Sequence, residues 1–190
     1  MRRALLDAAA RVFARRGIEA ASLDDVAADA GFTKGAVYSN FGSKDGLVAA
    51  LVADRTSAYL DLGLEAVEDL DGSMGARARV LGDRLTDASD GQRDWHLLFF
   101  ELWQRAVRSG DVDDVFRRHR DSLRVAVTAA IEDHVDRAGG SLPLPASELA
   151  TVLMALANGL AVERMVAPDD VAPDLMGRVL ALLVADGPVP

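Results

Sequence analysis

Residues 22–41 read SLDDVAADAGFTKGAVYSNF, and this stretch decides the fold. Ser22 suits the N-cap position of a helix, and Asp25 three residues later favours the positive end of the helix dipole. This helix would end near Ala30, because Gly31 can adopt the left-handed conformation that terminates helices. The pattern therefore predicts one short helix that is followed at once by a tight turn.

A second short helix is predicted directly after the turn. Thr33 can cap it, and the steep crossing of two helices joined so closely would point Val37 and Phe41 inward, with Phe32 dropping into the core. Spacing alone also fits an ordinary two-helix corner of an all-helical protein. The residues left facing outward suit close approach to a DNA groove; they are Lys34, Gly35, Tyr38, Ser39 and Asn40. Thr33 and Ala36 are expected to contact DNA as well.

From Ala9 to Leu51 the chain resembles the N-terminal domain of the TetR family of bacterial transcriptional regulators. In that family, the same run follows a first helix that ends in an aromatic residue and a glycine. One residue differs: Asn40 stands where the family often has histidine. The residues that carry the resemblance are Phe13, Gly17, Ser22, Asp25, Val26, Ala27, Ala30, Gly31, Thr33, Lys34, Gly35, Tyr38, Phe41, Lys44 and Leu47. The resemblance implies a repressor that leaves its DNA operator when a small molecule binds, and it leaves activation open.

The charge of the chain is unevenly distributed. A formal net charge of -9 over 190 residues by itself disfavours binding to nucleic-acid phosphates. Residues 1–53 hold seven Lys and Arg against six Asp and Glu, for +1, so the rest carry 14 against 24, for -10. We therefore expect residues 1–53 to form the DNA-binding domain and residues 54–190 to form a ligand-binding and dimerisation domain.

Helices are predicted on both sides of the DNA-binding motif. Apolar residues recur on one face from Arg2 to Arg16, so this helix would brace the motif and complete a three-helix unit. Ser43 can cap a long helix from Lys44 to about residue 70. In the first turn of that helix, Lys44 would hold a DNA phosphate, and a plain solvated lysine is the alternative.

The stretch Gln92–Ser109 is predicted to be a helix with an unusually wide apolar face. Its apolar residues cover an arc of about 200°, roughly twice what one packing face needs. Such a helix is buried on two sides or lines a cavity, and aromatic walls suit an apolar or aromatic small molecule. The alternative is that these side chains belong to the core. The expected ligand contacts are His96, Phe99, Phe100, Trp103, Phe116, Met154 and Asn158.

Four more helices complete an all-α chain of about nine helices. They are expected at residues 74–88, 111–137, 146–166 and 172–185. The last two are strongly apolar, and we expect them to pair with their copies in a homodimer. Such a symmetric dimer would bind a palindromic double-stranded operator.

Other classes of protein receive less support from the sequence. Cysteine is absent, the three histidines are widely spaced, and neither a metalloprotease motif nor a phosphate-binding glycine motif occurs. We therefore expect no catalytic residue, metal site or cofactor. A helical adaptor without DNA affinity remains the alternative of a different class. Nothing resembles a signal peptide or a membrane span, which predicts a cytoplasmic protein.

Overall fold

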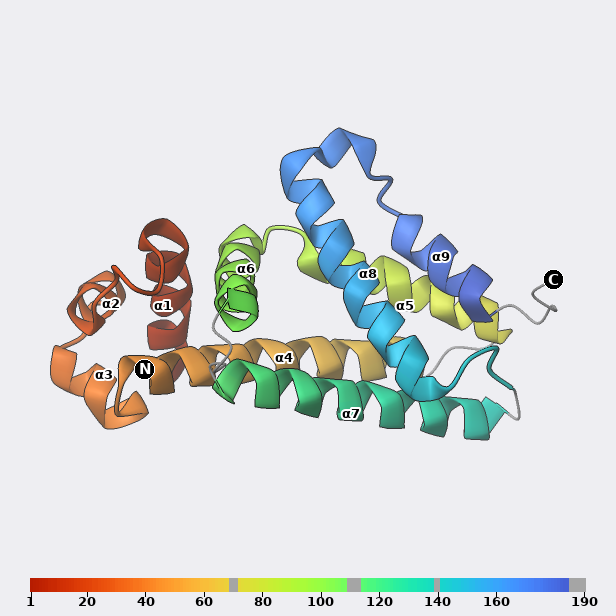
Figure 1. The fold of residues 1–190 in the computed structure, drawn as a ribbon, viewed down its shortest axis with the longest axis horizontal. Helices are drawn as coiled ribbons and strands as arrows, with labels where there is room; N and C mark the ends of the chain where they lie inside the picture. The colour runs from red at the N-terminus through yellow and green to blue at the C-terminus, as the bar shows by residue number, and fades with distance from the viewer. Residues whose placement is uncertain (69–71, 109–113, 139–140, 185–190) are drawn as a thin grey trace. The chain divides into compact units, whose positions relative to one another are not determined.

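The computed structural model describes residues 1–68, 72–108, 114–138 and 141–184, and within these ranges it contains helices and no strand (Figure 1). The α-helices are α1 (Arg2–Arg16), α2 (Leu23–Ala30), α3 (Lys34–Phe41), α4 (Lys44–Glu68), α5 (Met74–Ser89), α6 (Arg93–Arg108), α7 (Asp114–Ala138), α8 (Ala146–Val166) and α9 (Leu175–Val184). The predicted all-α fold of about nine helices is confirmed.

Most helix ends lie where capping residues predict them. The bounds of α1, α2, α3 and α8 agree with the sequence pattern. The last helix differs, because a 3₁₀ turn at Pro168–Asp170 comes first and α9 begins only at Leu175. Ala172 precedes Pro173, and a residue before proline is biased away from helical geometry. The expected ends of α4, α6 and α9 near residues 70, 109 and 185, and the start of α7 at residue 111, lie outside the described residues.

The chain forms two compact units. The first comprises Met1–Thr56 and Gln92–Arg120, and the second comprises Ser57–Gly91 and Asp121–Pro190. Helices α4 and α7 contribute residues to both units. The first unit therefore groups α6 with the N-terminal helices, whereas the expected functional boundary after residue 53 stays a prediction.

The core of the first unit is centred on α1. Phe13, Val26 and Val37 are fully buried, as the sequence pattern predicts. The expectation for two aromatic residues was wrong. Phe32 is 37% exposed. Its backbone N–H donates to the Ala27 carbonyl at the end of α2, so the residue belongs to the helix cap and its ring is not drawn into the core. Phe41 is only half-buried, and the Arg2 guanidinium lies 4.8 Å from the centre of its ring.

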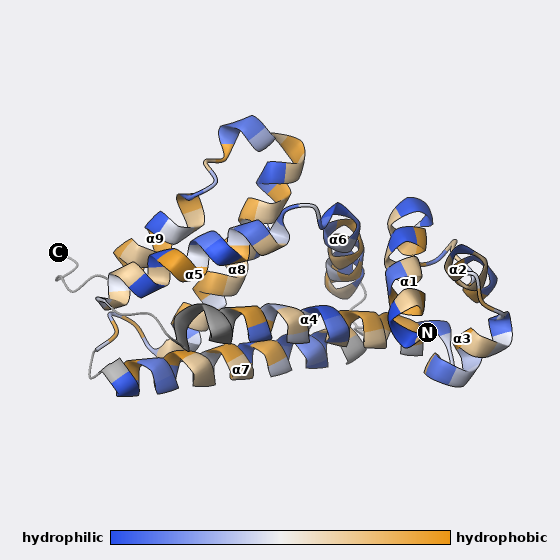
Figure 2. Ribbon diagram, turned by 180° about the vertical axis from the view of Figure 1, so that it is seen from behind, coloured by the Kyte–Doolittle hydropathy of each residue, from blue (hydrophilic) through white to orange (hydrophobic). Residues whose placement is uncertain are grey.

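The second unit packs α5 against α9 through two glycines. A Cβ atom on Gly82 would lie 2.5 Å from the Cα atom of Gly177, so the two backbones approach more closely than any side chain allows. Most of α9 is coloured in the hydrophobic range in Figure 2. Among the described residues, one helix, α8, is long and apolar enough to span a membrane, with 22% of its most apolar window buried. One such helix is weak evidence for a span, since core helices of soluble proteins have the same length and composition.

Candidate nucleic-acid interface

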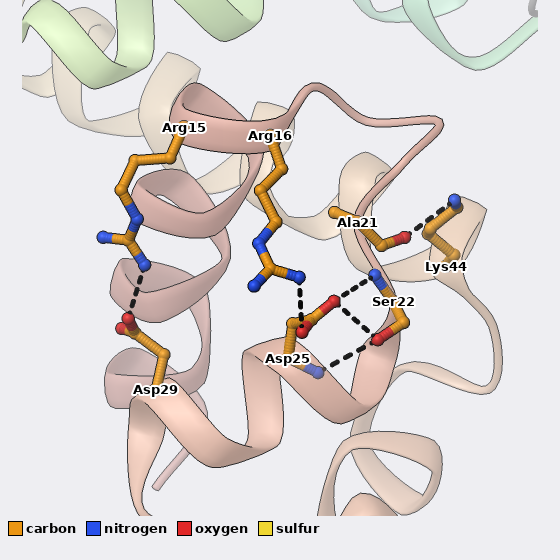
Figure 3. Close-up of polar contacts among 7 residues, drawn as sticks. All are labelled: Arg15, Arg16, Ala21, Ser22, Asp25, Asp29 and Lys44. Carbon is orange, nitrogen blue, oxygen red and sulfur yellow. Dashed lines mark hydrogen bonds and ion pairs between the residues drawn. The ribbon is translucent and has the colours of Figure 1, made fainter.

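The start of α2 is fixed by a reciprocal capping box. The Asp25 backbone N–H donates to Ser22 Oγ at 3.1 Å, and the Ser22 backbone N–H donates to Asp25 Oδ2 at 2.9 Å (Figure 3). The hydrogen bonds from Ser22 lower the pKa of Asp25, and the nearby Arg16 guanidinium lowers it further. The carboxylate is therefore charged at neutral pH and also favours the positive end of the helix dipole.

Ion pairs outside the core hold α2 against α1. Arg11 and Arg15 both donate to the carboxylate of Asp29 at 2.7 Å. These hydrogen bonds, with Arg15 contributing most, lower the pKa of Asp29. Arg16 donates to Asp25 at 2.7 Å in the same way. Three arginines of α1 thus serve the internal structure of the helix pair.

Half of the residues of helix α3 are exposed, namely Lys34, Gly35, Tyr38 and Ser39. Only Val37 of its eight residues is buried, while Tyr38 is 47% exposed. A Cβ atom added to Gly35 would meet nothing closer than Thr33 Oγ1 at 3.8 Å. The packing of the unit therefore does not require glycine at this position.

Polar side chains of α3 are engaged within their own helix. The Thr33 hydroxyl accepts a hydrogen bond from the Ala36 backbone N–H at 3.3 Å and caps the helix, as expected. Ser39 Oγ and Asn40 Nδ2 both donate to the Ala36 carbonyl, at 3.1 and 2.7 Å. The two side chains would have to exchange these bonds for contacts with DNA.

Lys34 lies at the first turn of α3 beside an acidic residue. Its ammonium donates to Asp24 at 2.8 Å and lies 5.9 Å from the centre of the Tyr38 ring. The hydrogen bond and charge of Asp24 raise the pKa of Lys34. Lys34 is therefore a cation on the exposed side of α3 that is already paired with an internal anion.

Lys44 has a set of partners that its position in the sequence did not indicate. Its ammonium donates to the carbonyl oxygens of Ile18, Glu19 and Ala21, at 2.8, 3.0 and 3.0 Å. A lysine ammonium has three protons, and these bonds use all of them. In this structure Lys44 is thus neither a solvated lysine nor free to hold a phosphate, and the expected phosphate contact would require it to release the backbone.

Aromatic residues of α6 and the start of α7 form a cluster around Phe99. The centre of the Phe99 ring lies 6.0 Å from Trp95, 5.7 Å from Trp103 and 5.4 Å from Phe116, with Phe100 at 5.9 Å. Trp95 and Phe116 are buried, whereas Phe99, Phe100 and Trp103 keep partial exposure. The structure therefore brings together four of the predicted ligand residues within the first unit.

The remaining predicted ligand residues are distributed between the units. His96 is buried on α6 in the first unit, while Met154 is buried and Asn158 half-buried on α8 in the second. Sequence reasoning missed Arg120, whose guanidinium lies 5.4 Å from the Trp103 ring. Its signal was the four-residue spacing from Phe116 along one helix, which places both on the same face. Among the described residues, no group of three or more His, Asp and Glu is arranged to hold a metal ion.

Comparison with protein families yields two matches that together cover most of the chain. Residues 5–51 match the bacterial regulatory proteins of the tetR family. Residues 74–186 match the C-terminal domain of BetI-type transcriptional repressors.

Individual relatives and structures agree with these matches. The HTH-type transcriptional regulator TtgR of Pseudomonas putida is 28% identical over 182 residues, which cover 92% of this chain and 84% of TtgR. The HTH-type transcriptional repressor KstR2 of Rhodococcus jostii is 30% identical over 155 residues, covering 65% of this chain and 76% of KstR2. The crystal structure of the transcriptional regulator FadR from Bacillus subtilis in complex with stearoyl-CoA has a TM-score of 0.77 at 12% identity, covering 97% of this chain and 98% of FadR.

Proposed function

We propose that this chain, which belongs to the TetR family of bacterial regulatory proteins, is a homodimeric repressor that leaves a palindromic operator when an apolar or aromatic small molecule binds. Membership of the family makes it a ligand-responsive DNA-binding transcriptional regulator. The proposed parts are the dimer, the operator symmetry, the sign of regulation and the effector class. The match to a repressor C-terminal domain and the repressor KstR2 support repression, and a bacterial regulator that binds DNA would act in the cytoplasm.

The exposed face of α3 carries the DNA-binding part of the proposal. Tyr38 and Thr33 would contact phosphates, and Gly35 would let the duplex backbone or a base edge approach the helix closely. The residues that would lie at or near the groove floor are Lys34, Gly35, Ala36, Ser39 and Asn40. The open space at Gly35 supports this placement, because packing within the unit gives no reason for the missing side chain.

The apolar surface of α8 and α9 supports a dimer. Leu182 is 77% exposed and Val152 is 38% exposed, although both lie on strongly apolar helices. A second copy would remove this surface from water, and a two-fold contact of this kind generates a palindromic operator.

The partly exposed aromatic rings support the effector site. We assign Phe99, Phe100, Trp103 and Phe116 to it, together with His96, and we keep Met154 and Asn158 as further expected contacts. FadR was crystallised with stearoyl-CoA, which supports a largely apolar effector for this fold.

Selection of DNA tests the first half of the proposal. The purified chain is incubated with random-sequence duplexes at low salt, and the bound fraction is amplified and sequenced. A recovered palindrome and a promoter that the protein silences in a reporter assay are expected. A promoter that the protein stimulates would favour an activator, and no affinity for any duplex would favour a helical adaptor.

Release by small molecules tests the second half. Apolar metabolites are screened for release of the recovered duplex, and Trp103→Ala is compared with the parent. The variant should keep the dimer and its DNA affinity and should lose most of the response to the releasing compound. A normal response would mean that the aromatic cluster is part of the protein core and does not bind the effector.

A further inference from the structure

The loop Gly17–Ala21 joins α1 to α2 and is held from two sides by oppositely charged side chains. On one side, the Ile18 backbone N–H donates to both carboxylate oxygens of Glu101, at 2.8 and 3.0 Å. On the other side, the ammonium of Lys44 donates to three carbonyls of the loop, the nearest being that of Ile18 at 2.8 Å. Ile18 itself is only 1% exposed. A single buried residue is thus fixed at its donor by α6 and at its acceptor by α4.

The hydrogen bonds of Lys44 link the two ends of the helix-turn-helix. Ala21 immediately precedes Ser22, the N-cap of α2, and Lys44 follows the C-cap of α3 by two residues. The bond from Lys44 to the Ala21 carbonyl, drawn in Figure 3, therefore ties the chain entering the motif to the chain leaving it. Because all three ammonium protons are used, no donor remains for a phosphate.

The bond of Glu101 brings α6 into the same arrangement. Glu101 is separated from Ile18 by 83 residues and lies between Phe100 and Trp103, two members of the aromatic cluster. A hydrogen bond to a charged group is stronger than a bond between neutral groups. Any movement of α6 that breaks this bond leaves the buried N–H of Ile18 without its partner.

We propose that Lys44 and Glu101 are positioning residues for the DNA-binding face: they clamp the loop at Ile18 and so set where α3 is presented to DNA. Neither side chain needs to touch the duplex. The inference rests on the proposed function and deepens it, since an effector that displaces α6 would act on α3 through this clamp. It differs from the expectation that Lys44 holds a phosphate.

Two substitutions of Lys44 separate the two roles. The probe is the duplex recovered by the selection described above, titrated by fluorescence anisotropy at several KCl concentrations. Lys44→Arg keeps the charge and binds phosphate at least as well, but its planar fork cannot place three donors on three converging carbonyls. If Lys44 acts as a clamp, Lys44→Arg should bind the duplex at least about fivefold more weakly, which is the lower end of the effect expected when the coupling between α4 and the loop is lost. A phosphate contact predicts parental affinity, which would overturn the inference.

The salt dependence gives a second criterion. Removing a phosphate contact makes the negative slope of log K against log salt shallower by about one, whereas a positioning residue changes affinity without changing the slope. Lys44→Met should therefore keep the parental slope. Lys34→Met removes a cation that the proposal places within the DNA groove, where its charge neutralises phosphate, so this matched control should make the slope shallower. A shallower slope for Lys44→Met would overturn the inference that Lys44 positions the loop without contacting DNA.

A double-mutant cycle tests whether Glu101 acts through the same loop. Glu101→Met keeps the length of the side chain and removes both oxygens that accept from the Ile18 N–H. Because either change releases Ile18, the double variant with Lys44→Met should lose less affinity than the product of the two single losses. Multiplicative losses would overturn the shared role. A parent protein that binds no duplex would instead refute the proposed function, so the two failures are distinguishable.

Discussion

The ammonium of Lys34 lies 2.8 Å from Oδ2 of Asp24, and this ion pair joins the first turn of α3 to the first turn of α2. The two side chains are 54% and 59% exposed, so the pair contributes little to folding. Its main consequence concerns charge, because it partly neutralises the one cation on the exposed face of α3 and places a carboxylate beside that face.

Asp24→Asn should strengthen DNA binding. The substitution removes the negative charge that is paired with Lys34 and lies next to the proposed groove contacts, so affinity at low salt should rise about two- to tenfold. Asp61→Asn, about 25 Å further along α4 than Lys44, is the charge-matched control and should have little effect. Fluorescence anisotropy with the selected duplex measures both variants, and unchanged or weaker binding of Asp24→Asn would contradict the placement of Lys34 at the groove.

Gly35→Ala should separate folding from DNA binding. Alanine is a better helix former than glycine, and the space around Gly35 accepts a methyl group, so the protein should become more stable by up to about 1 kcal/mol. The same methyl group should weaken DNA binding if the duplex approaches this position closely. Thermal unfolding and anisotropy are measured on the same sample. A variant that is more stable and binds DNA like the parent would remove Gly35 from the interface.

Local signals account for what the sequence predicted well. Capping residues such as Ser22 and Thr33, and glycines such as Gly31, act on backbone atoms within three or four residues, so helix ends and the helix-turn-helix could be placed from the chain alone. The role of Lys44 could not, because its carbonyl partners lie 23 to 26 residues away and become available only when the loop has folded. Glu101, 83 residues from Ile18, carried no recognisable signal at all.

Burial of histidines should make stability depend on pH near neutrality. Burial lowers the pKa of His119, whose Nε2 is paired with the Thr56 hydroxyl, and burial and the charge of Arg77 lower the pKa of His134. In the unfolded chain these two histidines therefore bind protons near pH 6.5, whereas in the folded chain they bind protons only at lower pH. Stability should be fully present above that value and should decline as the pH falls below it.

Urea unfolding at pH 7.5 and pH 5.5 measures this effect. His119→Gln, which can still bond to Thr56, should reduce the loss of stability between the two pH values, and His134→Gln should do the same for the second unit. Carboxylates such as Asp29, whose pKa is lowered, titrate at more acidic pH and do not contribute in this window. A parent protein that is equally stable at both pH values would contradict the burial of the two rings as neutral groups.

Gly177→Ala should destabilise the second unit. A Cβ atom at Gly177 would lie 2.6 Å from the backbone carbonyl oxygen of Arg79, which cannot move without disturbing α5. Overpacking of this kind costs roughly 1–3 kcal/mol. Gly159→Ala on α8 is the control, because a Cβ there meets nothing within 4 Å. Chemical denaturation should show a loss for the first variant and no loss for the second, and equal stabilities would refute the close crossing of α5 and α9.

Charges placed on α8 and α9 should disrupt the proposed dimer. Leu182 is 77% exposed in one protomer, so the protomer can fold without this side chain. A dimer that buries Leu182 would depend on it. Leu182→Asp together with Leu156→Asp places four carboxylates in a two-fold interface, and their desolvation should separate the protomers or leave the chain insoluble. Val125→Asp on α7, at a residue that is 62% exposed, adds a charge to an apolar position outside the interface and should leave the dimer intact. Light scattering over a range of protein concentrations measures the mass, and a folded double variant with the mass of a dimer would exclude α8 and α9 as the interface.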